Sequence, residues 1–180
     1  MLFRINVSLT EDDYFAFNQF HSIESKAGKK QLKKTRNIFV ICIAIMVLGV
    51  FMLKDLIYSI IFAAVVSFFS IVYLLFFKRL MKMSIKMQLK QMKKIGKLPF
   101  DSTAVIEFYE DRFAESTDSR RTEQTYASLD RICILKERYV ILYMDSVRAY
   151  ILPVPQLKMQ IDQEAFLDFI LQKCNKVEYY

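Results

Sequence analysis

A block of 40 residues, 38–77, contains only two charged side chains, Lys54 and Asp55, and constrains the fold more than any other feature. A soluble helix needs a polar face toward water, and a block of this length offers none. Lys54 and Asp55 separate a run of 17 residues, 37–53, from one of 22 residues, 56–77. About 20 helical residues cross about 30 Å of hydrocarbon. We therefore expect a hairpin of two transmembrane helices, with a pair of buried helices in a soluble protein as the alternative.

The net charge of +7 is concentrated beside this block. Residues 1–37 hold seven basic and four acidic side chains, and residues 78–100 hold eight basic and no acidic ones. Because basic residues favour the cytoplasmic side of a membrane, both termini are expected in the cytoplasm. The cations nearest the apolar block are candidate contacts for anionic lipid headgroups: Lys34, Arg36, Lys78, Arg79, Lys82 and Lys86.

The second apolar run carries small side chains at every fourth position: Ser59, Ala63 and Ser67. Small residues at this spacing permit the close approach of another helix, so these three are candidate helix-packing residues. The partner could be the run 37–53 of the same chain, a second protomer in a homo-oligomer, or another membrane protein. Neither run has a charge at its middle, which argues against an ion or proton pathway.

A basic amphipathic helix is expected over residues 78–99, with its end near Gly96 and Pro99. One sector of this helix is basic and the adjacent one is apolar, given a helical turn of about 100° per residue. The basic sector holds Lys82, Lys86, Lys90, Lys93 and Lys97, and the apolar stripe holds Met81, Ile85, Leu89, Met92 and Ile95. The stripe could pack on the protein itself, or the helix could contact anionic headgroups.

The N-terminal region, 1–36, begins with residues that alternate between apolar and polar over 3–9, the period of a half-buried strand. Thr10 and Asp13 then form a capping-box pattern that predicts the start of an amphipathic helix. The lone histidine, His21, falls in this helix without a second histidine nearby, so a metal or catalytic role is not expected.

The C-terminal region, 100–180, has short alternating runs separated by turn residues, which is typical of β structure. The expected strands are 103–109, 112–116, 123–126, 129–135, 139–144 and 147–152, with Pro153 and Pro155 ending the last. Asp162 is expected to cap a closing helix with Phe166 and Ile170 on its apolar face. A small curved sheet plugged by this helix would bury both apolar sets.

Catalytic, cofactor-binding and metal-binding residues are not expected. The three cysteines, Cys42, Cys133 and Cys174, are far apart in apolar patterns, so buried reduced thiols are favoured over disulfides or a zinc site. The chain has no GxSxG, P-loop, HExxH or CxxC motif. The region 101–180 is mildly acidic, with ten basic and fourteen acidic side chains, which argues against a nucleic-acid partner.

Three segments resemble the YcxB-like family of bacterial membrane proteins: 106–113 (IEFYEDRF), 126–132 (YASLDRI) and 149–153 (AYILP). The resemblance implies a two-helix anchor in the bacterial cell membrane that carries a pleckstrin-homology-like β-sandwich. It also implies that residues 3–9 supply a seventh strand. Val154 stands where this family often has a basic residue. The family has no generally assigned activity, so the resemblance carries no catalytic residues with it.

These observations predict an α+β membrane protein with four parts. They are the N-terminal strand and helix 1–36, the hairpin 37–77, the basic helix 78–99 and a cytoplasmic pleckstrin-homology-like domain 100–180. The expected function is a non-enzymatic, membrane-anchored interaction or regulatory module with an unknown protein partner. The alternative is a small regulator or immunity-type subunit that docks into a larger membrane complex through Ser59, Ala63 and Ser67. A lipid-headgroup sensor ranks third and would need a cationic patch at Arg120 and Arg121.

Overall fold

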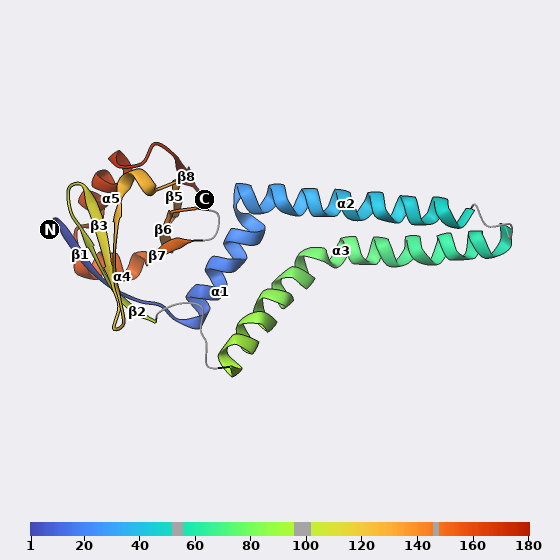
Figure 1. Ribbon diagram of the computed structural model, residues 1–180, viewed down its shortest axis with the longest axis horizontal. Coiled ribbons are helices and arrows are strands. Elements are labelled where there is room, and N and C mark those ends of the chain that lie inside the picture. The colour runs from blue at the N-terminus through green and yellow to red at the C-terminus, as the bar shows by residue number, and fades with distance from the viewer. Residues whose placement is uncertain (52–55, 96–101, 146–147) are drawn as a thin grey trace. The chain divides into compact units, whose positions relative to one another are not determined.

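The chain forms two compact units in a computed structural model (Figure 1). The structure describes residues 1–51, 56–95, 102–145 and 148–180. One unit combines Met1–Tyr14 with Pro99–Tyr180, and the other is Phe15–Leu98. The expected turn at Lys54 and Asp55 and the expected helix end at Gly96 and Pro99 lie outside the described residues.

The first unit contains a four-stranded antiparallel sheet in the order β1-β2-β3-β4. Its strands are β1 (Phe3–Ser8), β2 (Thr103–Phe108), β3 (Arg112–Ser116) and β4 (Arg121–Thr125). The N-terminal strand pairs with β2 across almost a hundred residues of chain, with Ile5 opposite Ile106. The expected N-terminal strand is thus confirmed, and it belongs to the same unit as the C-terminal region. The fourth strand starts two residues earlier than expected and ends one residue earlier, because Tyr126–Ser128 form a 3-10 turn.

A second sheet in this unit has the order β7-β6-β5-β8. Its strands are β5 (Arg131–Leu135), β6 (Tyr139–Tyr143), β7 (Ala149–Pro153) and β8 (Val177–Tyr179). The six strands expected between 103 and 152 are therefore all present, with small shifts at their ends. Val147, the expected start of the last one, lies outside the described residues. The strand β8, which pairs parallel to β5, was not expected.

Two helices come after β7 in the chain. The first, α4 (Val154–Gln160), was not expected, because Pro155 indicates the end of a strand as well as the start of a helix. Proline is tolerated in the first helical turn, where its missing N–H has no helical partner to lose. The expected closing helix is α5 (Gln163–Gln172), and its Asp162 cap is confirmed: the carboxylate accepts hydrogen bonds from the backbone N–H groups of Glu164 and Ala165 at 3.0 and 3.2 Å.

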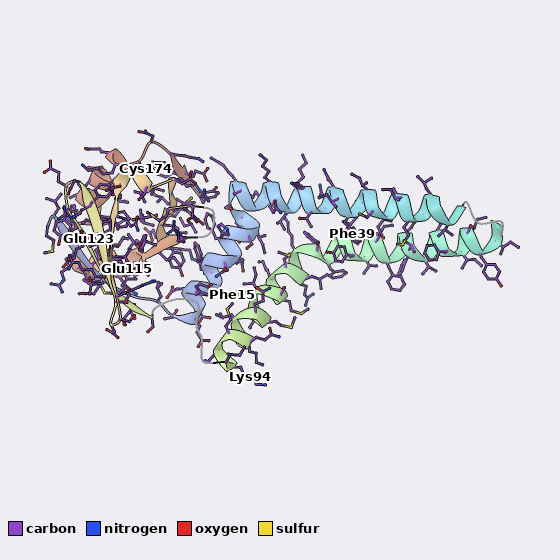
Figure 2. All side chains as sticks on the ribbon, in the orientation of Figure 1. Phe15, Phe39, Lys94, Glu115, Glu123 and Cys174 are labelled. Atoms are coloured by element: carbon purple, nitrogen blue, oxygen red, sulfur yellow. The ribbon has the colours of Figure 1, made fainter. Side chains whose placement is uncertain are left out.

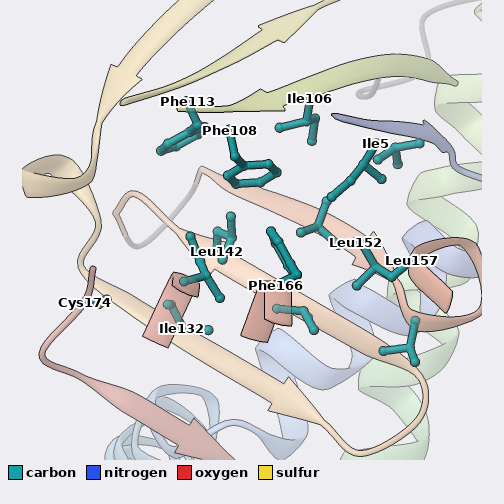
Figure 3. Close-up of a cluster of buried hydrophobic side chains, with 14 of the residues drawn as sticks. Ile5, Ile106, Phe108, Phe113, Ile132, Leu142, Leu152, Leu157, Phe166 and Cys174 are labelled. Atoms are coloured by element: carbon teal, nitrogen blue, oxygen red, sulfur yellow. The ribbon is translucent and has the colours of Figure 1, made fainter. Parts of the chain in front are cut away.

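The core of this unit lies between the two sheets (Figure 3). Inward-facing side chains from both sheets meet aromatic and aliphatic side chains from the helices, and the fully buried members include Ile5, Phe108, Phe113, Ile132, Leu142, Leu152, Leu157, Phe166 and Ile170. Phe166 of α5 packs edge-to-face on Phe108 and Phe3, with ring centroids 5.0 and 5.4 Å apart. The closing helix therefore supplies part of the core, as its apolar face predicts.

The second unit is helical. The helix α1 (Glu11–Gln19) runs on into a π-helical turn, η1 (Phe20–Glu24), and then come α2 (Lys26–Phe51) and α3 (Leu56–Lys94). The capping box is confirmed, since the Thr10 N–H donates to the Asp13 carboxylate at 2.9 Å and the Asp13 N–H donates to Thr10 Oγ1 at 3.1 Å.

The junction between η1 and α2 is tightly packed. Ser25 is buried, donates its hydroxyl to the His21 carbonyl at 2.7 Å, and accepts the Gly28 N–H at 2.9 Å as the cap of α2. A Cβ at Gly28 would lie 2.4 Å from the His21 carbonyl oxygen, so this close approach requires glycine. The imidazole of His21 stacks on Phe17 at 5.8 Å, which gives it a packing role.

Among the described residues, one helix segment is long and apolar enough to cross a membrane, Ile57–Lys94 of α3. Its most apolar stretch has a mean hydropathy of 2.7, and only 6% of that stretch is buried. The first expected span, 37–53, corresponds to the second half of α2, and its last two residues lie outside the described part of the chain. The fold class is therefore α+β, with a long apolar helix and two small sheets.

Candidate functional site

An exposed apolar belt surrounds the paired halves of α2 and α3, whose side chains project outward in Figure 2. The belt includes Ile41, Ile45, Leu48, Ile57, Ile60, Ile61, Val65, Phe68, Phe69, Ile71 and Leu75, each about half or more exposed. Monomeric soluble proteins rarely expose contiguous apolar patches larger than a few hundred Å². A helix pair that is apolar on every outward face needs an apolar surrounding.

The two helices run antiparallel and meet along a narrow seam. Near one end the Ser59 hydroxyl donates to the Val50 carbonyl at 3.0 Å, and further along the Phe39 and Tyr73 rings are 4.6 Å apart. The half-buried or buried residues of the seam are Phe39, Ile43, Val47 and Val50 on α2 and Ser59, Ala63, Val66, Ser70, Tyr73 and Phe77 on α3. Alternating steps of four and three residues on α3 keep one helical face toward α2.

The stripe of small residues is divided by this seam. Ser59 is buried and Ala63 is half-buried against α2, whereas Ser67 is exposed. Steps of four residues drift by about 40° each around a helix of 3.6 residues per turn, so the third member leaves the face that the first one occupies. Ser70 takes its place in the seam and donates its hydroxyl to the Val66 carbonyl of its own helix at 2.7 Å.

The six candidate headgroup contacts lie at one end of the paired helices. Lys34 and Arg36 precede the apolar part of α2, while Lys78, Arg79, Lys82 and Lys86 follow that of α3, and all six are exposed. Because the helices are antiparallel, both changes from apolar to basic occur at the end where Phe39 meets Tyr73. A shallow hollow on α2 crosses this boundary and is lined by Lys30, Lys33, Lys34, Asn37, Ile38 and Ile41, among others.

Beyond Phe77, α3 continues as the expected basic helix. Of its expected apolar stripe, Leu89 is buried and Met81 and Ile85 are half-buried, while Met92 and Ile95 are exposed. The lysines of the basic sector are exposed as far as Lys93, and Lys97 lies outside the described residues. A second apolar strip, Leu80, Met83 and Met87, is exposed beside the lysines. Part of the helix thus packs within the protein, and part presents cations and methionines together.

In the sheet unit, the outer edge of β1 is closed by two glutamines of α4. The Gln160 side chain accepts the Asn6 N–H at 2.7 Å and donates to the Asn6 carbonyl at 2.8 Å. The Gln156 side chain likewise accepts the Ser8 N–H at 2.9 Å and donates to the Ser8 carbonyl at 2.6 Å. These two side-chain amides take the place of a neighbouring strand, which protects the edge from pairing with another chain. The signal for this role in the sequence is weak, since the pairing joins residues about 150 positions apart.

The opposite edge of the same sheet is β4, which has a strand neighbour on one side only among the described strands. Its outward face carries Arg121 and Glu123, each about half exposed. Arg121 forms ion pairs at 3.4 Å with both Glu107 and Glu123, and Arg120 pairs with Glu115 at 3.8 Å. The two arginines proposed as an anion-binding patch are thus each matched with glutamates, which makes a poor trap for a phosphate group.

Titratable groups inside the sheet unit have structural partners. Burial raises the pKa of Asp13, but hydrogen bonds from Thr10 and from the Tyr139 hydroxyl, at 2.6 Å, outweigh it and lower the pKa below its usual value. Burial, assisted by the nearby Glu178 carboxylate, raises the pKa of the Cys133 thiol to about 11. A thiol with this pKa is a weak nucleophile at neutral pH.

Among the described residues, no group of three or more histidine, cysteine, aspartate or glutamate side chains could hold a metal ion. The candidate site is therefore a pair of surfaces: the apolar belt with its basic flank in the helical unit, and the free edge of β4 in the sheet unit. Comparisons with family models, with curated proteins and with solved structures find no match to this chain.

Proposed function

We propose that this chain is a non-enzymatic, membrane-anchored interaction module in which α2 and α3 cross the bilayer as a hairpin. The observation that carries the proposal is the exposed apolar belt around both helices. Residues 57–77 of α3 rise about 31 Å at 1.5 Å per residue, enough for the hydrocarbon core. The helical residues 37–51 of α2 rise about 22 Å, and snorkelling by Lys34 and Arg36 extends their reach.

Both termini are proposed to face the cytoplasm of a bacterium. The exposed cations of α2 and α3 are at the same end of the antiparallel pair, which supports one cytoplasmic end for the whole hairpin. At that end, Lys34, Arg36, Lys78 and Arg79 would contact anionic headgroups. Each cation near an anionic leaflet contributes on the order of 1 kcal/mol within a Debye length of the surface.

The sheet unit is proposed to be a pleckstrin-homology-like domain of the YcxB-like type. Two observations support this: the sheet β1-β2-β3-β4 faces the strands β5, β6 and β7 across one core, and α5 closes that core. The short strand β8 is an addition to the expected seven. In this proposal the unit is displayed at the membrane and binds a protein partner.

The alternative, a regulatory or immunity-type subunit that docks through its hairpin, has less support. Ser59 and Ala63 already pack on α2, which leaves Ser67 as the exposed member of the small-residue stripe. The apolar belt could still contact another membrane protein, so this alternative becomes one outcome of the test.

Affinity purification of the tagged full-length chain and of a version lacking residues 101–180, both from native membranes, tests the proposal. We expect a protein that co-purifies with the full-length chain and is lost with the deletion. A partner that both versions retain would favour docking through the hairpin. Release of the full-length chain from membranes by alkaline carbonate would refute the anchor itself.

A further inference from the structure

The edge strand β4 is the starting point for a further inference, because it differs from the other edge strands of the sheet unit. Glutamine side chains of α4 cover β1. In the second sheet, β7 ends in Pro153, which has no N–H to donate, and β8 has only three residues. The strand β4 has five residues and no proline, and the hydrogen bonds of the described residues cover only its last carbonyl, that of Thr125, which accepts the Ser128 hydroxyl at 2.6 Å.

The hydrogen-bonding parity of β4 can be derived from its hairpin with β3. The Thr117 N–H donates to the Arg120 carbonyl at 2.8 Å, so residues 117 and 120 form a hydrogen-bonded pair. Hydrogen-bonded and non-hydrogen-bonded pairs alternate along an antiparallel ladder. Since Ser116 lies opposite Arg121 and Ala114 opposite Glu123, Arg121 and Glu123 direct their main-chain N–H and C=O groups away from β3. Thr125, opposite Arg112, also directs these groups outward, but its carbonyl already accepts the Ser128 hydroxyl at 2.6 Å. The edge therefore offers two residues, Arg121 and Glu123, with both a donor and an acceptor available for a further strand.

We propose that β4 pairs antiparallel with β4 of a second copy of this chain, which joins two sheets into one of eight strands. A two-fold axis at Thr122 places Arg121 opposite Glu123 of the other copy, twice by symmetry. Opposite charges directly across an antiparallel pair are stabilising and like charges are destabilising. A two-fold axis at Glu123 would instead place the Glu123 carboxylates of the two copies opposite each other. Charge therefore selects the register centred on Thr122.

The side chains required for this pairing are accessible. Arg121 and Glu123 are about half exposed. The ion pairs that they form with Glu107, with Arg112 and with each other, at 3.4 Å, can be shared with a second copy. A pairing of five-residue strands is weak alone. The proposed pairing rests on the proposed function, because confinement to a membrane raises the effective concentration of the second copy and so favours a weak contact.

Disulfide trapping in the full-length chain tests the register. At the two-fold axis, Thr122 would face its own copy in a non-hydrogen-bonded pair with Cβ atoms about 4.5–5.5 Å apart, within reach of a disulfide after small adjustments. In this register Gln124 would lie four residues along the strand, or about 13 Å, from Gln124 of the second copy, which is too far for a disulfide. Cys42, which the sequence predicts to be buried, is exposed, so it is replaced by serine. In this Cys42→Ser background, mild oxidation should give a covalent dimer with Thr122→Cys and none with Gln124→Cys. Equal dimer formation by the two variants, or none by either, would overturn the proposal.

A charge exchange provides the second test. Adding Arg121→Glu to Thr122→Cys should abolish the dimer, and adding Glu123→Arg as well should restore it, because the cross-pairs form again with reversed sign. Protection of Cys133 from a thiol reagent confirms that each variant is folded. If dimer formation is unchanged by the single exchange, the pairing does not use this edge. The dimer is measured in the whole lysate and in the membrane fraction separately, so a failed anchor is distinguished from a failed edge.

Discussion

Replacement of Phe166 by alanine should loosen the whole sheet unit. This ring is fully buried and packs edge-to-face on Phe3 of β1 and Phe108 of β2, so it joins the closing helix to the first sheet. Truncating a buried phenylalanine costs about 3–5 kcal/mol through lost transfer energy and the cavity left behind. Domains are stable by about 5–15 kcal/mol, so the variant would lose a large part of its margin.

The Cys133 thiol provides a local assay for this loss. It is fully buried, and burial raises its pKa to about 11, so a thiol reagent reaches it only when the unit opens. A loss of about 3–5 kcal/mol corresponds to an increase of about 150- to 5,000-fold in the labelling rate when opening is in rapid equilibrium. The measurement uses the full-length chain in detergent with Cys42 replaced by serine, and mass spectrometry of the Cys133 peptide.

Met159→Ala is the matched control, because this side chain is 85% exposed on the neighbouring helix α4. An exposed substitution of this kind is expected to change stability by less than about 0.5 kcal/mol. If Cys133 is labelled no faster in the Phe166→Ala variant than in the Met159→Ala variant, the closing helix does not support the core and the packing argument is refuted.

Three further predictions concern the helical unit and its start. Ser59→Leu should lower the melting temperature in detergent, because the larger side chain overpacks the seam at a cost of about 1–3 kcal/mol, whereas Ser67→Leu should not. Equal effects of the two substitutions would place both serines on the same face of α3. Gly28→Ala should destabilise because its Cβ would meet a backbone carbonyl at 2.4 Å, while Gly49→Ala, with open space around it, should be neutral or slightly stabilising in the same melting assay. Because the pKa of Asp13 is lowered in the folded state, its carboxylate stabilises the fold above the usual pKa of 3.8, and this contribution is lost as the pH falls through the lower folded value. Asp13→Asn should remove this part of the acid dependence of unfolding. An unchanged acid profile would contradict the prediction.

Local features of the fold could be predicted from the sequence because short-range hydrogen bonds and side-chain periodicity determine them. The Thr10–Asp13 capping box, the Asp162 cap and the alternating strands of 103–152 belong to this class. The place of the N-terminal strand beside β2 is different, since residue periodicity alone does not identify a partner a hundred residues away. In the sequence, the one feature that predicts this pairing is the resemblance to the YcxB-like family, while the pairing itself is shown by the structure.

The features that sequence reasoning missed depend on tertiary context. Pro155 begins a helix although it also ends a strand, and its local sequence permits either role. Three-residue strands such as β8 are too short to produce a periodic pattern. Gln156 and Gln160 are ordinary polar residues until α4 lies along the edge of β1. The candidate membrane contacts follow from the change from apolar to basic residues in the sequence itself, and they stay a prediction.

The hairpin anchor is the central proposal, and the accessibility of introduced cysteines to a membrane-impermeant thiol reagent tests it most directly, since the native Cys133 and Cys174 are buried. Cysteines placed one at a time at Lys34, Asp55 and Lys82, in a Cys42→Ser background, are labelled in intact cells and in inverted membrane vesicles. Two spans predict that Lys34→Cys and Lys82→Cys react only in inverted vesicles and that Asp55→Cys reacts only in intact cells. Reaction of Lys34→Cys and Lys82→Cys from opposite sides would mean a single span and would contradict the hairpin.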